Sequence, residues 1–180
     1  MIGLSIDALK PELLQKMGRC TKNNEILTPT RCISLCKSIK ENDMQLKINT
    51  VVSKLNLQEN FIDFIQTVCP DRWKILKMKG FSNGKIDNYK LEIPEDDFNR
   101  FCSLYTSIPH IKETSLKNTY IMIDSGGRLV DNSTEQYKPI ANLLQKSFSE
   151  AFKDLPFEEA LYESRYNNIG NNSRERVSFI

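Results

Sequence analysis

The stretch LKINTVV at residues 46–52 begins with alternating apolar and polar side chains and is rich in β-branched residues, as β-strands are. Two other segments share this design, LSID at residues 4–7 and RWKI at residues 72–75. Within each segment the polar residues stand two apart, so they point to one face of the strand. Helical stretches separate the segments, which predicts parallel strands, and parallel strands are usually buried on both faces.

The second and third segments carry four polar side chains on these faces: Lys47, Asn49, Arg72 and Lys74. Unpaired buried charge is costly, so a buried face that carries them requires an anionic partner. If the two strands are neighbours, about 4.8 Å apart, the four donors converge on one small patch. Guanidinium groups bind oxygens bidentately and ammonium groups supply point charge, so this set matches an oligophosphate.

Simpler interpretations of the same residues stay open. The cations could lie at strand ends and reach solvent, or they could pair with Asp71 or Glu59. Ser5 and Asp7 form a similar pair on the first strand. That pair either holds a ribose or an amino acid group, or caps the strand end before the turn at Ala8.

The composition fits a folded protein of 180 residues with one ordinary domain, 39% hydrophobic and 27% charged residues. A formal net charge of only +2 gives no reason to expect DNA as a partner. The sequence shows no apolar run long enough to span a membrane and no signal-peptide pattern. Five cysteines at irregular spacings are a poor disulfide framework, so we expect a reducing, cytoplasmic location.

The order of expected elements predicts an α/β fold. Strands at 1–7, 46–52 and 72–78 alternate with helices at 11–17, 29–42 and 58–68, and such βαβ units form right-handed parallel sheets. The pattern then changes to a turn-rich stretch at 80–90, a helix at 94–105, a hairpin of 119–123 with 128–130, and a helix at 137–152. We therefore expect three parts: 1–105 with the parallel units, 106–166 as a C-terminal extension, and a frayed polar tail at 167–180.

The cysteine pair Cys32 and Cys36 is suggestive of a cluster motif but incomplete. A C-x3-C-x2-C loop binds a four-iron cluster and leaves one iron free for S-adenosylmethionine, whereas Ile39 occupies the third position here. Two thiols cannot hold such a cluster without further ligands. We expect packing cysteines on a helix, and no metal site.

Three other features favour structural roles. The loop at 80–85 is one residue short of a phosphate-binding loop, and Ile86 replaces the required Ser or Thr. His110 follows Pro109 without an acid or thiol motif, which predicts a surface loop. Trp73 alternates away from the cationic face, so we expect it in the core between sheet and helices.

Residues 47–52 through Asn56, followed by PDRWKI at 70–75, resemble the viperin family of radical S-adenosylmethionine enzymes. That family has a K-I-N-[ST]-V strand, a helix and a P-x-R-W-K strand. SID at 5–7 with MGR at 17–19 is similar to its S-I-D strand and I-G-R turn. Residues 95–101 and 118–124 are similar to its D-[DE]-F-x-R-F helix and [DN]-[ST]-Y-L-I-L-D strand, so the resemblance covers about residues 1–125.

The resemblance implies a partial (β/α)6 barrel, of which this chain would be the C-terminal half with an α+β extension. Family members cleave S-adenosylmethionine at a 4Fe-4S cluster and form a 5′-deoxyadenosyl radical. The radical abstracts hydrogen from C4′ of a nucleoside triphosphate (CTP, GTP or UTP), and the 3′ hydroxyl leaves as water. The product is a 3′-deoxy-3′,4′-didehydro nucleotide that terminates viral RNA chains.

The resemblance also implies roles for individual residues. The triphosphate would be held by Lys47, Asn49, Arg72 and Lys74. Tyr120 matches a tyrosine close to the nucleotide, and Ser5 and Arg19 match positions near S-adenosylmethionine. The resemblance assigns no catalytic residue to this chain.

The chain departs from the family at both ends. The family's cluster loop, first strands and glycine-rich S-adenosylmethionine segment would precede Met1, and residues 163–166 are at best a degraded form of its R-G-G-x-Y tail. We therefore expect a truncated or split enzyme that is inactive alone and requires either a separately encoded N-terminal half or the missing segment restored. The strand at 1–7 would be an open edge that invites pairing. The alternative is a non-catalytic nucleotide-binding or interaction remnant.

Overall fold

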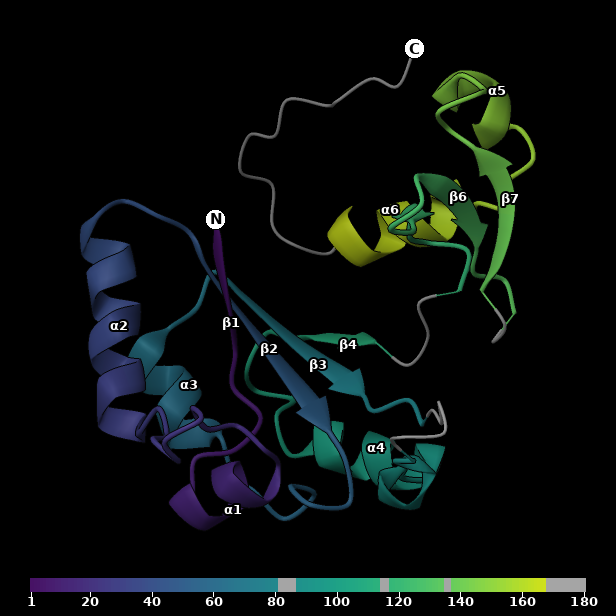
Figure 1. The fold of residues 1–180 in the computed structure, drawn as a ribbon. Helices are drawn as coiled ribbons and strands as arrows, with labels where there is room; N and C mark the ends of the chain where they lie inside the picture. The colour runs from purple at the N-terminus through teal and green to yellow at the C-terminus, as the bar shows by residue number, and fades with distance from the viewer. Residues whose placement is uncertain (81–86, 114–116, 135–136, 168–180) are drawn as a thin grey trace. The chain divides into compact units, whose positions relative to one another are not determined.

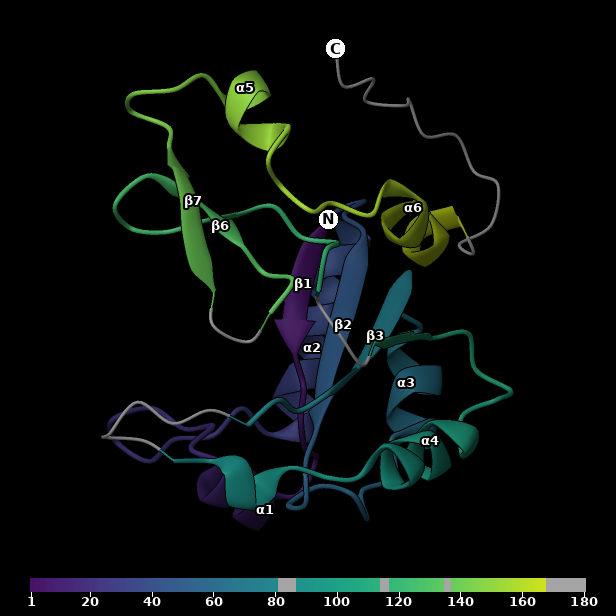
Figure 2. The same cartoon turned by 90° about the vertical axis from the view of Figure 1, so that its right-hand side faces the viewer.

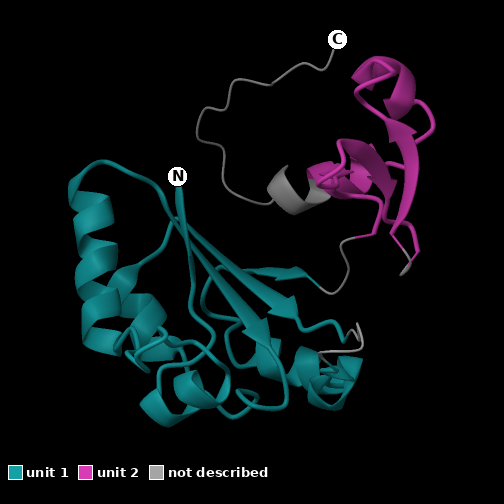
Figure 3. Cartoon of the chain, viewed as in Figure 1, with its two compact units in different colours: residues 1–114 teal, residues 115–180 magenta. Residues whose placement is uncertain are grey.

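The computed structural model describes residues 1–80, 87–113, 117–134 and 137–167. The chain divides into two compact units, Met1–Thr114 and Ser115–Ile180 (Figure 3). Among the described residues, none of the helices has the length and apolar character that a membrane span needs. The expected turn at 80–90 and the polar tail at 167–180 fall largely outside the described residues.

A four-stranded parallel sheet forms the centre of the first unit (Figure 1). Its strands are β1 (Ile2–Ser5), β2 (Leu46–Val52), β3 (Arg72–Lys77) and β4 (Ile111–Glu113), in the spatial order β1-β2-β3-β4. The parallel arrangement expected from the sequence is confirmed. β1 lies at one edge of this sheet, and β4 pairs with β3 although the sequence analysis placed 111–113 in the C-terminal extension.

The helices of this unit are α1 (Pro11–Lys16), α2 (Pro29–Glu41), α3 (Ile62–Val68) and α4 (Glu95–Ser103), with a 3-10 turn η1 at Tyr89–Leu91. Thr28 caps α2 by accepting a hydrogen bond from the Arg31 N–H, and Pro29 occupies the first turn, where its missing N–H costs nothing. Three acidic residues stand in the first turn of α4, as expected for compensation of the helix dipole.

One hydrophobic core lies between the sheet and α2, α3 and α4 (Figure 2). The alternate residues Leu46, Ile48 and Val52 of β2 are fully buried in it. Trp73 is buried as expected; its indole N–H donates to Thr50 Oγ1 at 3.0 Å, and its ring centroid lies 4.8 Å from that of Tyr105. The sheet therefore has one apolar face that packs against the helices. The alternate residues of β2 and β3, such as Lys47 and Lys74, lie on the opposite face.

The helix expected at 58–68 begins later, at Ile62. Asn56 organises the preceding loop instead: its amide group donates to the main-chain oxygens of Asp7 (2.6 Å) and Val51 (2.8 Å) and accepts from the Ser53 N–H (2.7 Å). A side chain that satisfies main-chain groups in this way competes with helix formation. The loops after β1 and β2 are thus tied together at the carboxyl edge of the sheet.

The second unit contains an antiparallel sheet of β5 (Met122–Ile123), β6 (Arg128–Asp131) and β7 (Lys138–Asn142), and the helices α5 (Phe148–Phe152) and α6 (Glu159–Asn167). The expected hairpin of 119–123 with 128–130 is confirmed, although β5 is shorter than expected. Asp124 accepts hydrogen bonds from the Gly126 and Arg128 N–H groups, and Gly127 has a φ of 72° that favours glycine.

The helix expected at 137–152 is wrong. Residues 138–142 form β7, which pairs with β6, and only 148–152 are helical. Pro139 is compatible with this outcome, because β7 is an edge strand of the three-stranded sheet and proline is tolerated in edge strands. Ser147 and Glu150 then form a capping box that starts α5 at residue 148.

Candidate functional site

The strand register brings the predicted oligophosphate residues together on the face of the sheet opposite the helices. Lys47 lies opposite Arg72, and Asn49 lies opposite Lys74. Ser5 is paired with Asn49 from the other side. The expectation that these strands are neighbours and present their polar residues to one face is therefore confirmed, whereas the binding of a phosphate group stays a prediction.

Two of the cations on this face are buried: Arg72 is 9% exposed and Lys74 is 2% exposed. Lys47 is half-buried beside them. Burial lowers the pKa of the Lys47 ammonium, and the positive charges of Lys74 and Arg72 lower it further, while Glu113 has the opposite effect. The three cations therefore repel one another across the strands, which is the electrostatic condition for binding an anion.

A carboxylate from β4 partly balances this charge. Lys74 Nζ forms an ion pair with Glu113 Oε2, and the two side chains are only 3% and 2% exposed. Asp71 and Glu59 were alternative partners for the cations, and Lys74 pairs with neither of them. Asp71 accepts from the Leu46 N–H at 2.7 Å, and Glu59 instead pairs with Lys10.

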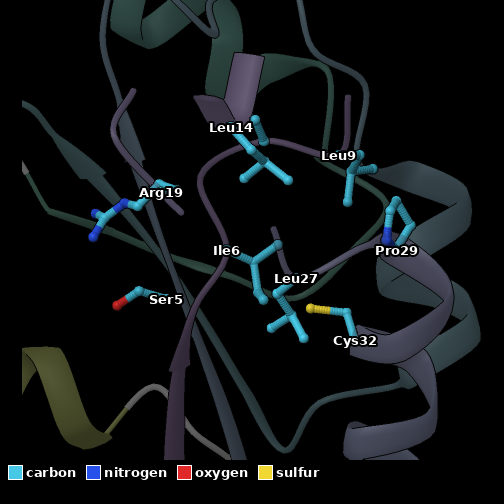
Figure 4. Close-up of a pocket in the computed structure, with 9 residues that line it drawn as sticks. Ser5, Ile6, Leu9, Leu14, Arg19, Leu27, Pro29 and Cys32 are labelled. Atoms are coloured by element: carbon cyan, nitrogen blue, oxygen red, sulfur yellow. The ribbon is translucent and has the colours of Figure 1, made fainter. Parts of the chain in front are cut away.

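Ser5 and Arg19, the positions predicted to lie near S-adenosylmethionine, line a single pocket beside the end of β1. Figure 4 shows these two side chains on one side of the pocket and apolar side chains from the following segments on the other. The apolar lining includes Leu9, Leu27 and Cys32. A hydroxyl, a guanidinium and an apolar wall suit an amphipathic ligand with an anionic group.

Asp7 and Ser5 do not form an exposed pair of polar side chains that could hold a ligand together. Its carboxylate is buried, accepts a hydrogen bond from the Val51 N–H at 2.8 Å, and forms an ion pair with Arg19. The strand-end interpretation is therefore the one that the contacts of Asp7 support. By pairing with Arg19, Asp7 holds the guanidinium at the pocket.

Two further residues from the sequence predictions are Tyr120, expected near the nucleotide, and His110, expected in a surface loop. Tyr120 belongs to the second unit, where its main-chain oxygen accepts a hydrogen bond from Asn132, so its place near a nucleotide stays a prediction. His110 is half-buried rather than on an open surface loop, because its ring packs 5.8 Å from that of Trp73 between centroids.

The two cysteines of α2 do not fit an iron–sulfur cluster. Both are buried, and burial raises the pKa of the Cys32 thiol to about 11, with a further contribution from Cys36. Cluster ligands are thiolates, which such an environment disfavours. Within the described ranges, groups of three or more residues suited to a metal ion are absent.

Comparison with curated proteins identifies relatives over most of the chain. It is 34% identical over 170 residues to an S-adenosylmethionine-dependent nucleotide dehydratase of Selenomonas ruminantium, covering 92% of this chain and 62% of the relative. A protein of the same name from Flammeovirga pacifica is 32% identical over 164 residues, with 87% and 55% covered. The chain belongs to the viperin-like S-adenosylmethionine-dependent nucleotide dehydratase family.

This dehydratase-family chain spans 62% and 55% of the lengths of those two relatives. Its fold is similar to that of Streptococcus suis SuiB, solved bound to S-adenosylmethionine, with a TM-score of 0.59 and 16% sequence identity. The match covers 89% of this chain and 44% of SuiB, and it supports the α/β fold with a parallel sheet. A scan against protein-family models gives no match.

Proposed function

We propose that this chain provides the nucleotide-binding face of an S-adenosylmethionine-dependent nucleotide dehydratase. In this proposal the parallel sheet is the C-terminal part of a partial (β/α)6 barrel, and the second unit is its α+β extension. The substrate is a nucleoside triphosphate (CTP, GTP or UTP), which the complete enzyme converts to its 3′-deoxy-3′,4′-didehydro form. Family membership supports the reaction, and the cationic face of the sheet supports the substrate class.

The observation that carries the proposal is the register of Lys47 with Arg72 and of Asn49 with Lys74. A triphosphate has several negative charges along one chain. The two facing pairs of residues place cations at successive positions along β2 and β3. Arg72 can bind two oxygens at once, while the ammonium groups supply charge without a fixed geometry. Burial lowers the pKa of Lys47 and the charges of Lys74 and Arg72 lower it further, so a bound anion would favour the charged form of Lys47.

The pocket beside β1 fits S-adenosylmethionine by the chemistry of its lining. Arg19 would hold the carboxylate of the ligand, Ser5 would donate to a polar group, and the apolar wall would contact the remainder. When bound, S-adenosylmethionine supplies the 5′-deoxyadenosyl group for the family's radical chemistry. The residues of this chain would bind and orient that ligand beside the nucleotide.

The buried cysteines of α2, Cys32 and Cys36, do not fit the family's 4Fe-4S cluster, and they have no role in the proposed reaction. In the proposed enzyme a further segment or a separate N-terminal chain provides the cluster ligands. The rival function is a nucleotide-binding or interaction module without catalysis. The buried pair of Lys74 and Glu113 offsets part of the positive charge internally, and this observation favours an interaction module over a nucleotide-binding one.

Binding is tested by calorimetric titration of the full chain with nucleoside triphosphates. Lys47→Ala is the sharpest variant, because Lys47 is half-buried and its removal leaves the Lys74–Glu113 pair intact. We expect it to weaken binding by about tenfold, the effect of losing one charge-assisted contact of about 1.4 kcal/mol. Lys37→Ala, the same change on the exposed surface of α2, is the matched control and should bind as the wild type does. Equal affinities for all three proteins would contradict the proposal.

Catalysis is tested separately by anaerobic reconstitution with iron, sulfide and a chain that carries the C-x3-C-x2-C motif. The dehydratase proposal predicts that 5′-deoxyadenosine and a dehydrated nucleotide appear together. Nucleotide binding without either product would favour the binding module instead.

A further inference from the structure

Glu113 occupies a position on the sheet that the proposed nucleotide-binding residues do not explain. It lies on β4, opposite Leu76 in the register, and Lys74 lies opposite Ile111 two residues earlier. Residues two apart on a strand share a face, so Glu113 projects to the same face as Lys74. Its side chain, 2% exposed, forms the ion pair with Lys74 there.

A buried carboxylate beside a phosphate-binding face has two opposite effects. Without a ligand it lowers the repulsion among Lys47, Arg72 and Lys74, because it places a negative charge among them. With a triphosphate present, the same carboxylate repels the ligand and competes with it for the Lys74 ammonium. The same side chain therefore stabilises the unliganded face and opposes ligand binding.

We propose that Glu113 is an internal counter-anion, a positioning residue that holds Lys74 in the unliganded protein and competes with the phosphate groups of the nucleotide for it. This inference rests on the proposed function and adds the control of affinity at the same site. The carboxylate keeps the cationic face folded between binding events. It also limits how tightly a triphosphate is held, which favours release of a nucleotide product.

The test compares wild type, Glu113→Gln and Glu95→Gln by titration with inorganic triphosphate and with CTP, each alongside a thermal melt. Glu95 is the matched control, because it pairs with Lys77 and Lys112 but is 49% exposed. We expect Glu113→Gln to melt about 5 °C or more below the wild type without ligand. It should also bind both ligands about tenfold more tightly, because a nearby negative charge has been removed. Glu95→Gln should change neither property.

Unchanged or weaker binding by a folded Glu113→Gln protein would overturn the inference while leaving the proposed function intact. Binding of neither ligand by any of the three proteins would overturn both. If Glu113→Gln does not fold alone, saturating inorganic triphosphate should restore a cooperative melt, since the ligand replaces the lost negative charge. Failure of that rescue, measured against sodium chloride at equal ionic strength, would also overturn the inference.

Discussion

Lys47 and Arg72 lie directly opposite each other in the parallel register of β2 and β3, on the face of the sheet that the helices do not cover. Two cations in neighbouring strands oppose folding unless an anion offsets them. The pairing of Lys74 with Glu113 offsets part of this cost, and we propose that a triphosphate offsets the rest.

Replacing Lys47 with methionine should stabilise the ligand-free chain by about 0.5 kcal/mol at pH 7, because a repelled ammonium is removed and its apolar stem is kept. The folded-state pKa of Lys47 lies below its usual 10.5, so the unfolded chain binds more protons between those two values. The cost of charging Lys47 is therefore fully present below the folded pKa and is relieved as pH rises towards 10.5.

The check is urea denaturation of wild type and Lys47→Met at pH 7 and near pH 10. The stability difference between the two proteins should shrink at the higher pH. A difference that grows with pH would show that Lys47 is stabilised, not repelled, by its surroundings.

Removing one partner of the buried ion pair should be far more costly than removing both. Lys74→Met leaves Glu113 as a buried charge without Lys74, and we expect a loss of about 3–5 kcal/mol in the free energy of unfolding. The double variant Lys74→Met with Glu113→Met should recover most of that loss. A double-mutant cycle by chemical denaturation measures this coupling; additive losses would show that the two side chains do not interact in solution.

Asn56→Ala should lower the free energy of unfolding by about 2–4 kcal/mol. The side chain is fully buried, and its loss leaves the main-chain groups of Asp7, Val51 and Ser53 without these partners. Asn99→Ala, an exposed asparagine on α4, should change stability by less than about 0.5 kcal/mol. Similar losses in the two variants would mean that the loop after β2 does not depend on Asn56.

Arg19→Ala should weaken binding of S-adenosylhomocysteine, an unreactive probe for the pocket beside β1, by about tenfold or more. The variant also removes the ion-pair partner of the buried Asp7 carboxylate, which keeps its hydrogen bond to the Val51 N–H, so a thermal melt must show that the variant is folded before affinities are compared. Arg100→Ala, which removes an exposed arginine on α4, is the control for net charge. Calorimetry that gives one affinity for all three proteins would remove Arg19 from the proposed ligand site.

The sequence was sufficient to predict β2 and β3, because apolar and polar residues alternate in 46–52 and 72–75. This alternation indicates both a β-strand and which of its residues share the polar face. It did not predict Glu113, because a three-residue strand is too short for a period to be visible. The second unit was harder to predict for a related reason. Residues 138–142 become a strand through pairing with 128–131, and that contact cannot be seen in the local pattern.

The proposed function requires that the face formed by β2 and β3 binds the triphosphate of a nucleotide. The most direct measurement is a calorimetric titration of the full chain with CTP and, in parallel, with cytidine, at two ionic strengths. We expect saturable binding of CTP with a dissociation constant below about 100 μM, weaker binding at the higher ionic strength, and no detectable binding of cytidine. Binding of cytidine as tightly as CTP, or of neither, would contradict it.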